Sequence, residues 1–175
     1  MKTIKFIPVL LLVAVVSSCS TVRVTSDYDT NATFGSYSTF AYFKPGIDKA
    51  EISDLDKKRI LRAIDDELTA KGLQKSDNPD LFISFFTKSK ERVDVYQSHY
   101  GWGGYWGWGW GYPWGYNSVS KTTEGTLYID IIDAKRNELI WQGVGTAPLI
   151  KGNVDKKEER IRLIVQEILK KFPPQ

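Results

Sequence analysis

The chain has 175 residues, of which 42% are hydrophobic, so it is long enough for one domain with a packed core and too apolar for a disordered chain. Its 24 basic and 21 acidic residues give a net charge of +3 and form no concentrated basic stripe, which argues against a nucleic-acid binder. The single cysteine excludes an internal disulfide and a cysteine-based zinc site, and the single histidine excludes a histidine-rich metal centre. We therefore expect a small globular domain that uses no metal and no cofactor.

The first 18 residues have the three-part pattern of a bacterial export signal. Lys2 and Lys5 precede an apolar run over residues 6–16, and small residues follow it. This run is shorter than the about 20 residues that a membrane-spanning helix needs. The sequence VSSC at 16–19 resembles the lipobox of bacterial lipoproteins, which implies cleavage after Ser18 and acylation of Cys19, for example by palmitate. Residues 1–18 are thus expected to be a lipoprotein signal peptide, and Cys19 the site of lipidation.

The residue after the acylated cysteine bears on localisation. In enterobacteria-like sorting, Asp at this position tends to retain lipoproteins in the inner membrane, whereas this chain has Ser20. We therefore expect a cell-envelope protein that is lipid-anchored to the outer membrane and faces the periplasm, with display on the cell surface as an open alternative. Removal of the signal peptide also removes Lys2 and Lys5, so the mature chain is nearly neutral.

The beginning of the mature chain is expected to contain two strands. Residues 19–30 combine a lipidated tether with a first strand, because Val22 and Val24 alternate with polar residues. Residues 31–175 are expected to form a single α+β domain. Within it, the aromatic sequence FGSYSTFAYF predicts a strand over residues 34–43, and KPG predicts a turn over residues 44–46.

Helix signals follow at residues 53–71, where Ser53 is a natural N-cap and Gly72 a natural stop. The apolar sequence LFISFF predicts a buried strand over residues 81–86, and a second strand is expected over residues 91–96 after a bend or bulge at residues 87–90. The strand–helix–strand order also predicts a right-handed crossover that lays the helix on the sheet.

The last third of the chain predicts a hairpin and a helix. Residues 118–133 and 139–145 alternate as two paired strands. The second helix is expected to begin at Asn153 or Asp155, and its buried stripe consists of Ile161, Ile164, Val165, Ile168 and Leu169. These elements indicate the α+β class, with one mostly antiparallel sheet, two helices packed on one face, and a long Gly/Trp/Tyr-rich loop between strands.

Several segments, in their order and spacing, resemble one known family. They are FGSYSTFAYF at 34–43, LTAKGL at 68–73, NPDLFISF at 78–85, LYIDIIDAKRNELIWQG at 127–143 and ILKKFPP at 168–174. Together they are similar to the bacterial lipoprotein family known as domain of unknown function 4136, over nearly the whole mature chain. The resemblance implies an exported, usually lipid-anchored α+β domain without an assigned activity, and it supplies no catalytic residues.

An aromatic, glycine-rich loop over residues 100–117 is the most distinctive part of the sequence. Residues 100–116 contain five Trp, four Tyr and seven Gly, and no charged residue lies between Asp94 and Lys121. The glycines disfavour a helix and weaken a strand, while Trp and Tyr suit membrane–water interfaces and stack on sugar rings. We expect this loop to be the contact surface, with candidate binding residues Trp102, Tyr105, Trp106, Trp108, Trp110, Tyr112 and Trp114.

Four interpretations of this loop stay open. It is either a loosely structured connection without a ligand, a contact with the membrane near the lipid anchor, a platform for peptidoglycan or another glycan, or a contact with an envelope protein. Deletion of residues 101–115 is expected to leave the fold intact and abolish binding.

Sequence signals for catalysis are weak. His99 has no obvious orienting carboxylate in the sequence, no G-x-S-x-G motif occurs, and residues 145–152 depart from a P-loop. The adjacent acidic pairs at 65–66 and 158–159 are interpreted as solvated helix surface. We therefore expect a non-enzymatic lipoprotein without catalytic or metal-binding residues. The alternatives are a hydrolase of envelope polymers and a structural subunit of an envelope assembly.

Overall fold

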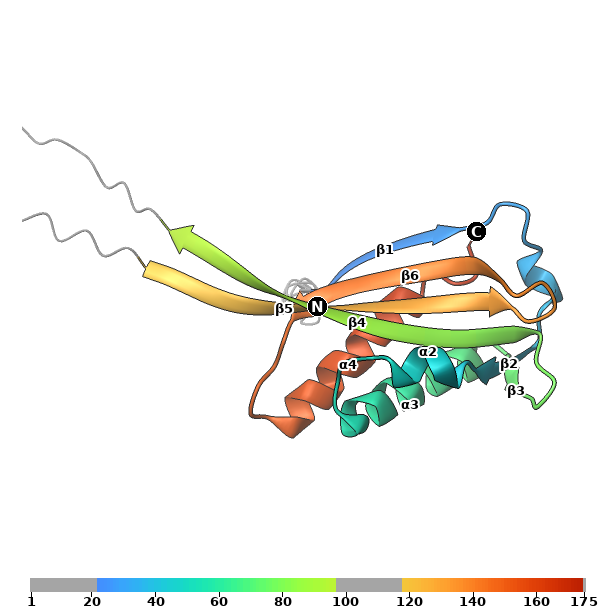
Figure 1. The fold of residues 1–175 in the computed structure, drawn as a ribbon, viewed down its shortest axis with the longest axis horizontal. Coiled ribbons are helices and arrows are strands. Elements are labelled where there is room, and N and C mark those ends of the chain that lie inside the picture. The colour runs from blue at the N-terminus through green and yellow to red at the C-terminus, as the bar shows by residue number, and fades with distance from the viewer. Residues whose placement is uncertain (1–21, 97–117, 175) are drawn as a thin grey trace, which may run out of the picture.

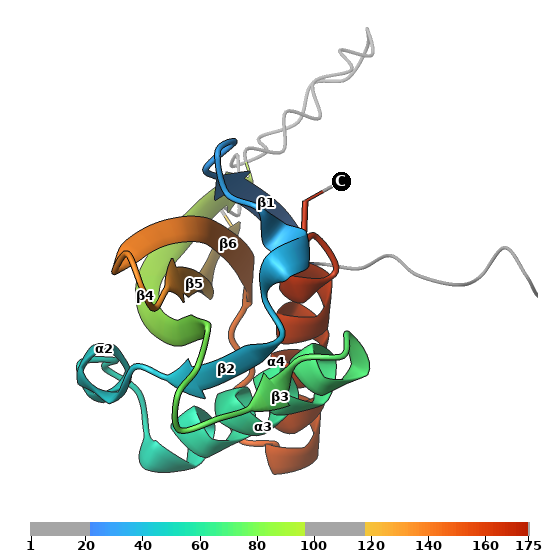
Figure 2. The same ribbon diagram turned by 90° about the vertical axis from the view of Figure 1, so that its right-hand side faces the viewer.

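The computed structural model describes residues 22–96 and 118–174, which form two layers (Figure 1). One layer is a curved six-stranded sheet, and the other consists of helices packed on its concave face (Figure 2). The elements in chain order are β1 (Arg23–Tyr28), the 3₁₀ turn η2 (Phe34–Ser36), β2 (Thr39–Tyr42), α2 (Lys44–Asp48), α3 (Asp54–Ala70), β3 (Gln74–Lys75), β4 (Leu81–Tyr96), β5 (Ser118–Asp133), β6 (Glu138–Pro148) and α4 (Val154–Leu169). The α+β class is confirmed.

The sheet is mixed, which corrects the expectation of a mostly antiparallel one. Its strand order is β1-β6-β5-β4-β2-β3. The strands β1, β6, β5 and β4 pair antiparallel, whereas β2 runs parallel to both β4 and β3. The chain leaves β2, passes through α3 and returns to the sheet, and a helical connection of this kind allows the strands on either side of it to run parallel.

The predicted strand over residues 34–43 is wrong in its first half. Phe34–Ser36 forms the turn η2, and only Thr39–Tyr42 is a strand. The ring of Phe34 packs edge-on against the rings of Tyr28 and Phe172, with centroid distances of 6.1 and 5.9 Å. Packing against the end of β1 and against a residue that follows α4, rather than strand pairing, therefore positions Phe34.

The predicted turn at residues 44–46 is also wrong, because Lys44–Asp48 forms the short helix α2. Pro45 stands in the first turn of this helix, where a missing N–H costs nothing. Gly46 lies against β4, since a Cβ added there would be 2.2 Å from the Ser84 Oγ atom. Helix α2 thus continues along β4 beyond the end of β2.

Helix α3 begins and ends where the sequence predicts. The Ser53 Oγ atom accepts a hydrogen bond from the Asp56 N–H at 3.2 Å. Gly72 adopts a φ of 90°, and the Leu73 N–H donates to the Leu68 carbonyl at 3.1 Å, which closes the helix with a Schellman-type contact. Its inner face contributes the buried side chains of Ile60, Ala63, Ile64 and Leu68 to the core.

Helix α4 lies close to β6. Asn153 is its N-cap, because the Asn153 Oδ1 atom accepts from the Lys156 N–H at 2.8 Å. Of the predicted stripe, Ile164, Val165, Ile168 and Leu169 are buried, whereas Ile161 is half-buried. Glycines on β6 permit the close approach: a Cβ at Gly143 or Gly145 would lie within 2.4 or 2.8 Å of the Ile168 side chain.

The strand β4 is continuous, so the predicted bend or bulge at residues 87–90 is wrong. Its register with β5 runs without interruption from Leu81, opposite Asp133, to Tyr96, opposite Ser118. On the sheet face opposite the helices, the rings of Phe86 and Tyr128 stack at a centroid distance of 4.3 Å, and the Lys88 ammonium lies 5.4 Å from the Tyr128 centroid. These contacts between β4 and β5 favour an extended backbone at the polar residues 87–90.

Candidate functional site

A two-stranded arm extends from the sheet. The strand β6 ends at Pro148, opposite Glu124, whereas β4 and β5 stay paired as far as Tyr96 and Ser118. Residues 91–96 and 118–123 therefore form the arm, which projects away from the helices in Figure 1. At about 3.3 Å per residue, the arm is about 20 Å long. Its two strands are joined by residues 97–117, the stretch that contains the aromatic segment.

The residues predicted as the site lie outside the described parts of the chain. They are Cys19, His99, Trp102, Tyr105, Trp106, Trp108, Trp110, Tyr112 and Trp114. The structure fixes the two points to which the aromatic segment is attached, at Tyr96 and Ser118, and the point at which the chain enters the sheet, at Arg23.

The chain enters the sheet at the base of the arm. The Arg23 guanidinium donates from its Nη2 atom to both carboxylate oxygens of Glu124, at 2.9 and 3.0 Å. Beside this ion pair, the hydroxyls of Thr126 and Thr146 lie 3.1 Å apart. Because β1 runs antiparallel to β6 from this point, β1 begins at the arm end of the sheet and runs away from it.

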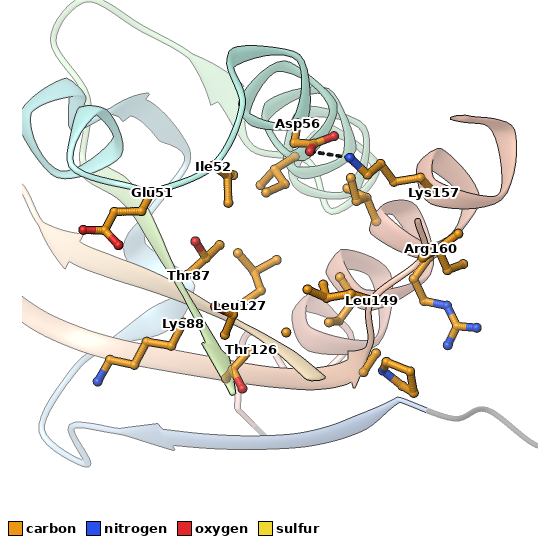
Figure 3. Close-up of a pocket in the computed structure, with 18 residues that line it drawn as sticks. Glu51, Ile52, Asp56, Thr87, Lys88, Thr126, Leu127, Leu149, Lys157 and Arg160 are labelled. Carbon is orange, nitrogen blue, oxygen red and sulfur yellow. Dashed lines mark hydrogen bonds and ion pairs between the residues drawn. The ribbon is translucent and has the colours of Figure 1, made fainter. Parts of the chain in front are cut away.

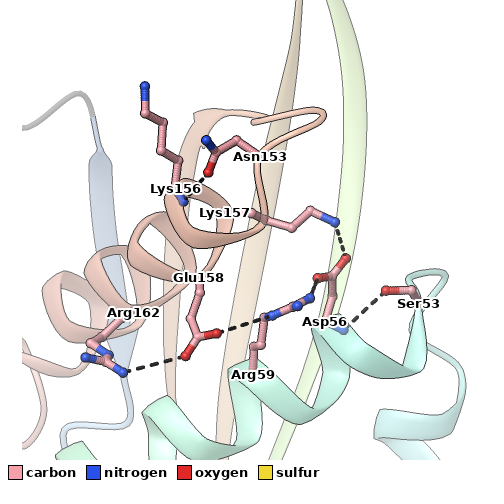
Figure 4. Close-up of polar contacts among 8 residues, drawn as sticks. All are labelled: Ser53, Asp56, Arg59, Asn153, Lys156, Lys157, Glu158 and Arg162. Atoms are coloured by element: carbon pink, nitrogen blue, oxygen red, sulfur yellow. Dashed lines mark hydrogen bonds and ion pairs between the residues drawn. The ribbon is translucent and has the colours of Figure 1, made fainter.

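The first turns of α3 and α4 lie at the same end and are joined by ion pairs (Figure 4). The Lys157 Nζ atom and the Arg59 Nη1 atom each lie 2.7 Å from a carboxylate oxygen of Asp56. The Arg59 Nε atom lies 3.7 Å from Glu158. Burial tends to raise the pKa of Asp56, but the hydrogen bonds from Lys157, Ser53 and Arg59 outweigh it and lower the pKa. This carboxylate therefore stays ionised and ties the two helices together.

A cavity of about 450 Å³ opens between these helix ends and the base of the arm (Figure 3). Its floor is formed by β4, β5 and β6, its sides by α3 and α4, and its cover by residues 51–52 and 148–150. The walls are mainly apolar, and charged side chains stand at the edge. Sequence analysis missed this cavity, because its lining comes from six separate stretches of the chain.

Two other carboxylates hold loops of the body. Asp80 accepts hydrogen bonds from the backbone N–H and the hydroxyl of both Ser38 and Thr39, and these bonds lower the pKa of Asp80. Asp133 accepts from the Tyr37 hydroxyl at 2.8 Å and from the backbone and side chain of Arg136. Burial opposes the shift, but these hydrogen bonds lower the pKa of Asp133 to about 2. Both groups therefore have structural partners.

The acidic pair at 65–66 is only partly the solvated surface that the sequence predicts. Asp66 is exposed, whereas Asp65 accepts from the Tyr42 hydroxyl at 2.6 Å and pairs with the Lys75 ammonium at 2.7 Å. Burial, and then the bond to Asp65, raises the pKa of Tyr42. Sequence reasoning missed this cluster because its members come from β2, α3 and β3.

One carboxyl group, that of Asp130, lies on the sheet face opposite the helices, where the Gln142 amide donates to it at 2.7 Å. Burial raises the pKa of Asp130, and this hydrogen bond offsets part of the rise. Within residues 22–96 and 118–174, no three His, Cys, Asp or Glu side chains are grouped so that they could hold a metal ion. No helix in these two stretches is long and apolar enough to cross a membrane.

Solved structures with a similar fold are distant in sequence. A PDZ domain protein from Parabacteroides distasonis shares 18% identity and a TM-score of 0.53 over 88% of this chain, which spans 36% of that protein. A PelC dodecamer from Paraburkholderia phytofirmans has 11% identity and a TM-score of 0.46, over 85% of this chain and 95% of that one. A minor lipoprotein from Acinetobacter baumannii has 12% identity and a TM-score of 0.37, over 76% and 85% of the two chains. The first likeness shows a shared fold, and the other two are too remote to support an argument.

No curated protein is similar enough to count as a relative. The profile of one family, described as "Domain of unknown function (DUF4136)", matches residues 24–174. The match begins in β1 and ends after α4, so it includes the sheet, the helices and both strands of the arm. The chain therefore belongs to the DUF4136 family.

Proposed function

We propose that this protein is a lipid-anchored, non-enzymatic protein of the bacterial cell envelope, and that its arm presents the aromatic segment to the membrane that holds the anchor. The observation that carries the proposal is the position of Arg23 at the base of the arm. A lipid anchor at Cys19 would thereby be attached to the same end of the body as the aromatic segment.

The lengths involved agree with a contact between the segment and the membrane. Three residues lie between Cys19 and Arg23, so the two residues are at most about 14 Å apart along an extended chain. The arm adds about 20 Å on the same side of the body. An anchor at Cys19 would therefore bring the bilayer within reach of residues that follow Tyr96 and precede Ser118.

The chemistry of the segment suits a membrane–water interface. Its five Trp and four Tyr combine large apolar area with N–H and O–H groups, and such residues concentrate at the level of lipid headgroups. The interval between Asp94 and Lys121 has no charged residue that would resist partial insertion. A lipid anchor and an aromatic contact would together fix the orientation of the body on the membrane.

A role in contact rather than catalysis is supported by the described carboxyl groups. Asp56, Asp80 and Asp133 have lowered pKa values because they hold helices and loops in place. The outer membrane and its periplasmic face are proposed as the location, on the basis of the lipobox and of Ser20. Replacement of Cys19 by Ala is expected to move the protein from the membrane fraction to the soluble fraction, and its retention in the membrane would contradict the anchor.

The aromatic contact is tested by quenching of tryptophan fluorescence. The mature lipoprotein is reconstituted into phosphatidylethanolamine–phosphatidylglycerol vesicles whose acyl chains carry bromine at different depths. The fully buried Trp141 provides an internal reference, because deletion of residues 101–115 removes every other tryptophan. We expect strong quenching by shallow bromines in the wild type and little in the deletion variant.

Equal fluorescence in brominated and ordinary vesicles would overturn the membrane contact while leaving the lipid anchor untouched. A spectral change that appears only after peptidoglycan fragments are added would instead favour a glycan platform. Loss of the native fold in the deletion variant, seen by near-UV circular dichroism, would show that residues 101–115 belong to the core.

A further inference from the structure

The cavity at the arm end of the body has the dimensions of a small-molecule site. Its volume of about 450 Å³ falls within the range of about 300–1,000 Å³ that is usual for ligand pockets. It lies on the helix-covered side of the sheet, where Leu127 and Ala147 form the floor and Ile60, Ile161 and Ile164 form the walls. In Figure 3 the side chains of Ile52, Leu127 and Leu149 stand around one central space.

The sequence itself creates this space. Gly125 and Ala147 are paired across β5 and β6, so a glycine and an alanine meet at the floor. The Leu149 side chain extends over Gly125, where an added Cβ would lie 2.4 Å from the Leu149 Cδ2 atom. Leu149 is nevertheless 49% exposed. A leucine that covers an opening without filling it leaves apolar surface that a ligand could bury.

The interior of the cavity is apolar, and charged side chains stand at its edge. Lys157 and Arg160 contribute two cations on the α4 side, and Glu51 and Asp56 contribute two carboxylates. The Lys88 side chain points away from the cavity, towards the rings of Phe86 and Tyr128 (Figure 3). The Asp56–Lys157 ion pair joins the first turns of α3 and α4 and so fixes the spacing between them. Both remaining cations project from α4, so this side of the opening suits a ligand whose apolar part ends in an anionic group.

The cavity opens at the arm end of the body, and this location indicates which apolar ligand could reach it. The cavity lies beside residues 87–89 and 125–127, at the base of the arm, and at the same end as Arg23. Within the proposed function this end faces the bilayer, which contains acyl chains at high local concentration. The supply of acyl chains from the bilayer rests on the proposed function, whereas the shape and the lining of the cavity are independent of it.

We propose that the cavity binds the acyl chain of an anionic, single-chain amphiphile of the fatty-acid class. The chain lies among Ile60, Leu127, Leu149 and Ile161, and the carboxylate stays at the edge near Lys157 and Arg160. This is a site distinct from the aromatic segment. Binding is dominated by burial of methylene groups, so affinity falls about fourfold for each methylene removed from a chain that the cavity contains entirely.

The test uses a photoreactive palmitic acid analogue, at low mole fraction in vesicles that carry the mature protein. After irradiation, the labelled peptides are mapped by mass spectrometry. We expect labelling of residues that line the cavity, and saturation by unlabelled palmitic acid but not by octanoic acid. Labelling that is spread over the molecule, or that unlabelled palmitic acid does not reduce, would overturn the proposal.

A matched pair of variants separates the cavity from general apolar surface. Leu149→Glu places a charge in the cavity, whereas Leu139→Glu makes the same change at the far end of β6, where the leucine is 51% exposed. Labelling should fall at least about fivefold in Leu149→Glu and stay unchanged in Leu139→Glu. Equal labelling of the two would overturn the proposal.

Two further measurements, of folding and of membrane attachment, accompany the labelling experiment. Thermal unfolding shows whether Leu149→Glu is folded; if it is not, Ala147→Leu, which narrows the floor, replaces it and should reduce labelling in the same way. Flotation of the vesicles reports membrane attachment independently. A protein that detaches but is labelled by palmitic acid in solution would contradict the proposed function and support the cavity.

Discussion

The body and the arm share the same two strands, but different interactions hold them. In the body, Leu81, Ile83 and Phe85 of β4 are fully buried beneath the helices, and β6 adds a third strand beside β5. In the arm, residues 91–96 and 118–123 pair with each other beyond the end of β6. An isolated two-stranded hairpin is at best marginally stable in water, so the arm depends on the body for its register.

This difference assigns stability and contact to separate regions. The body buries a continuous apolar core that includes Trp141, Phe40 and Phe85. The arm carries the two attachment points of the aromatic segment away from that core. Changes in the body should therefore alter the free energy of unfolding, and changes in the aromatic segment should alter binding with little effect on stability.

The largest expected effect is in the core. Trp141→Ala removes a fully buried indole that packs against the ring of Phe172 at a centroid distance of 5.3 Å. We expect the free energy of unfolding, measured by urea denaturation, to fall by about 3–5 kcal/mol. The control Leu139→Ala, at a half-exposed residue two positions away, should cost no more than about 0.5–1 kcal/mol. A cost below about 1 kcal/mol for Trp141→Ala would show that stability is not concentrated in the body.

A smaller effect is expected where α4 approaches β6. Gly145→Ala introduces a Cβ that would lie 2.8 Å from side-chain atoms of Ile164 and Ile168, so these side chains or the helix that carries them have to move. The expected cost is about 1–3 kcal/mol, because a well-packed core resists added volume. Gly35→Ala makes the same change where nothing lies within 4 Å and should be neutral or stabilising by up to about 1 kcal/mol. Equal melting temperatures for the two variants would contradict close packing at Gly145.

Acid should weaken the body through Asp133. The folded pKa of this group, about 2, is below its ordinary value of 3.8, so its contribution to stability is complete above about pH 4 and is lost as the pH falls towards 2. We expect a loss of about 1–2 kcal/mol over this interval, measured by urea denaturation at each pH. In Asp133→Asn the slope over the same interval should be clearly shallower. An unchanged slope would mean that other carboxylates account for acid sensitivity.

The smallest effect is expected at the junction of body and arm. Arg23 is well exposed, so its ion pair with Glu124 should contribute less than about 1 kcal/mol. Arg23→Ala should lower the melting temperature slightly at low salt and hardly at all at 1 M salt, where surface charges are screened. A loss that persists at high salt would indicate that Arg23 acts through packing.

The sequence predicted those elements whose signals are local. Ser53 and Gly72 mark the ends of α3 by capping chemistry that acts within a few residues. Pro45, by contrast, is suited both to a turn and to the first turn of a helix, so its presence does not distinguish the two. The parallel pairing of β2 with β4 and β3 depends on where the chain returns after α3, which no local pattern specifies.

The sequence indicates the chemical character of the aromatic segment but not where the segment is attached to the fold. The composition of residues 100–116 indicates a contact surface without showing where it is attached. The contact between Arg23 and Glu124, which are 101 residues apart in sequence, shows that the chain enters the sheet at the base of the arm that carries this segment. Residues 87–90 were predicted to bend, because stacking of Phe86 on Tyr128 is a contact between strands and leaves no periodic signal in either strand.

The central claim, that the arm end of the body faces the membrane, is tested most directly by energy transfer from a dye on the protein to an acceptor lipid. The only native cysteine is Cys19, which lipidation would block, so a single introduced cysteine can be labelled uniquely. Lys90→Cys lies on β4 near the base of the arm, and Lys135→Cys lies in the turn between β5 and β6 at the other end of the body; both lysines are exposed. The stretch of β5 from Glu124, opposite Lys90, to Asp133 is about 30 Å long. We predict much stronger transfer from residue 90 than from residue 135, whereas equal or stronger transfer from residue 135 would contradict the account.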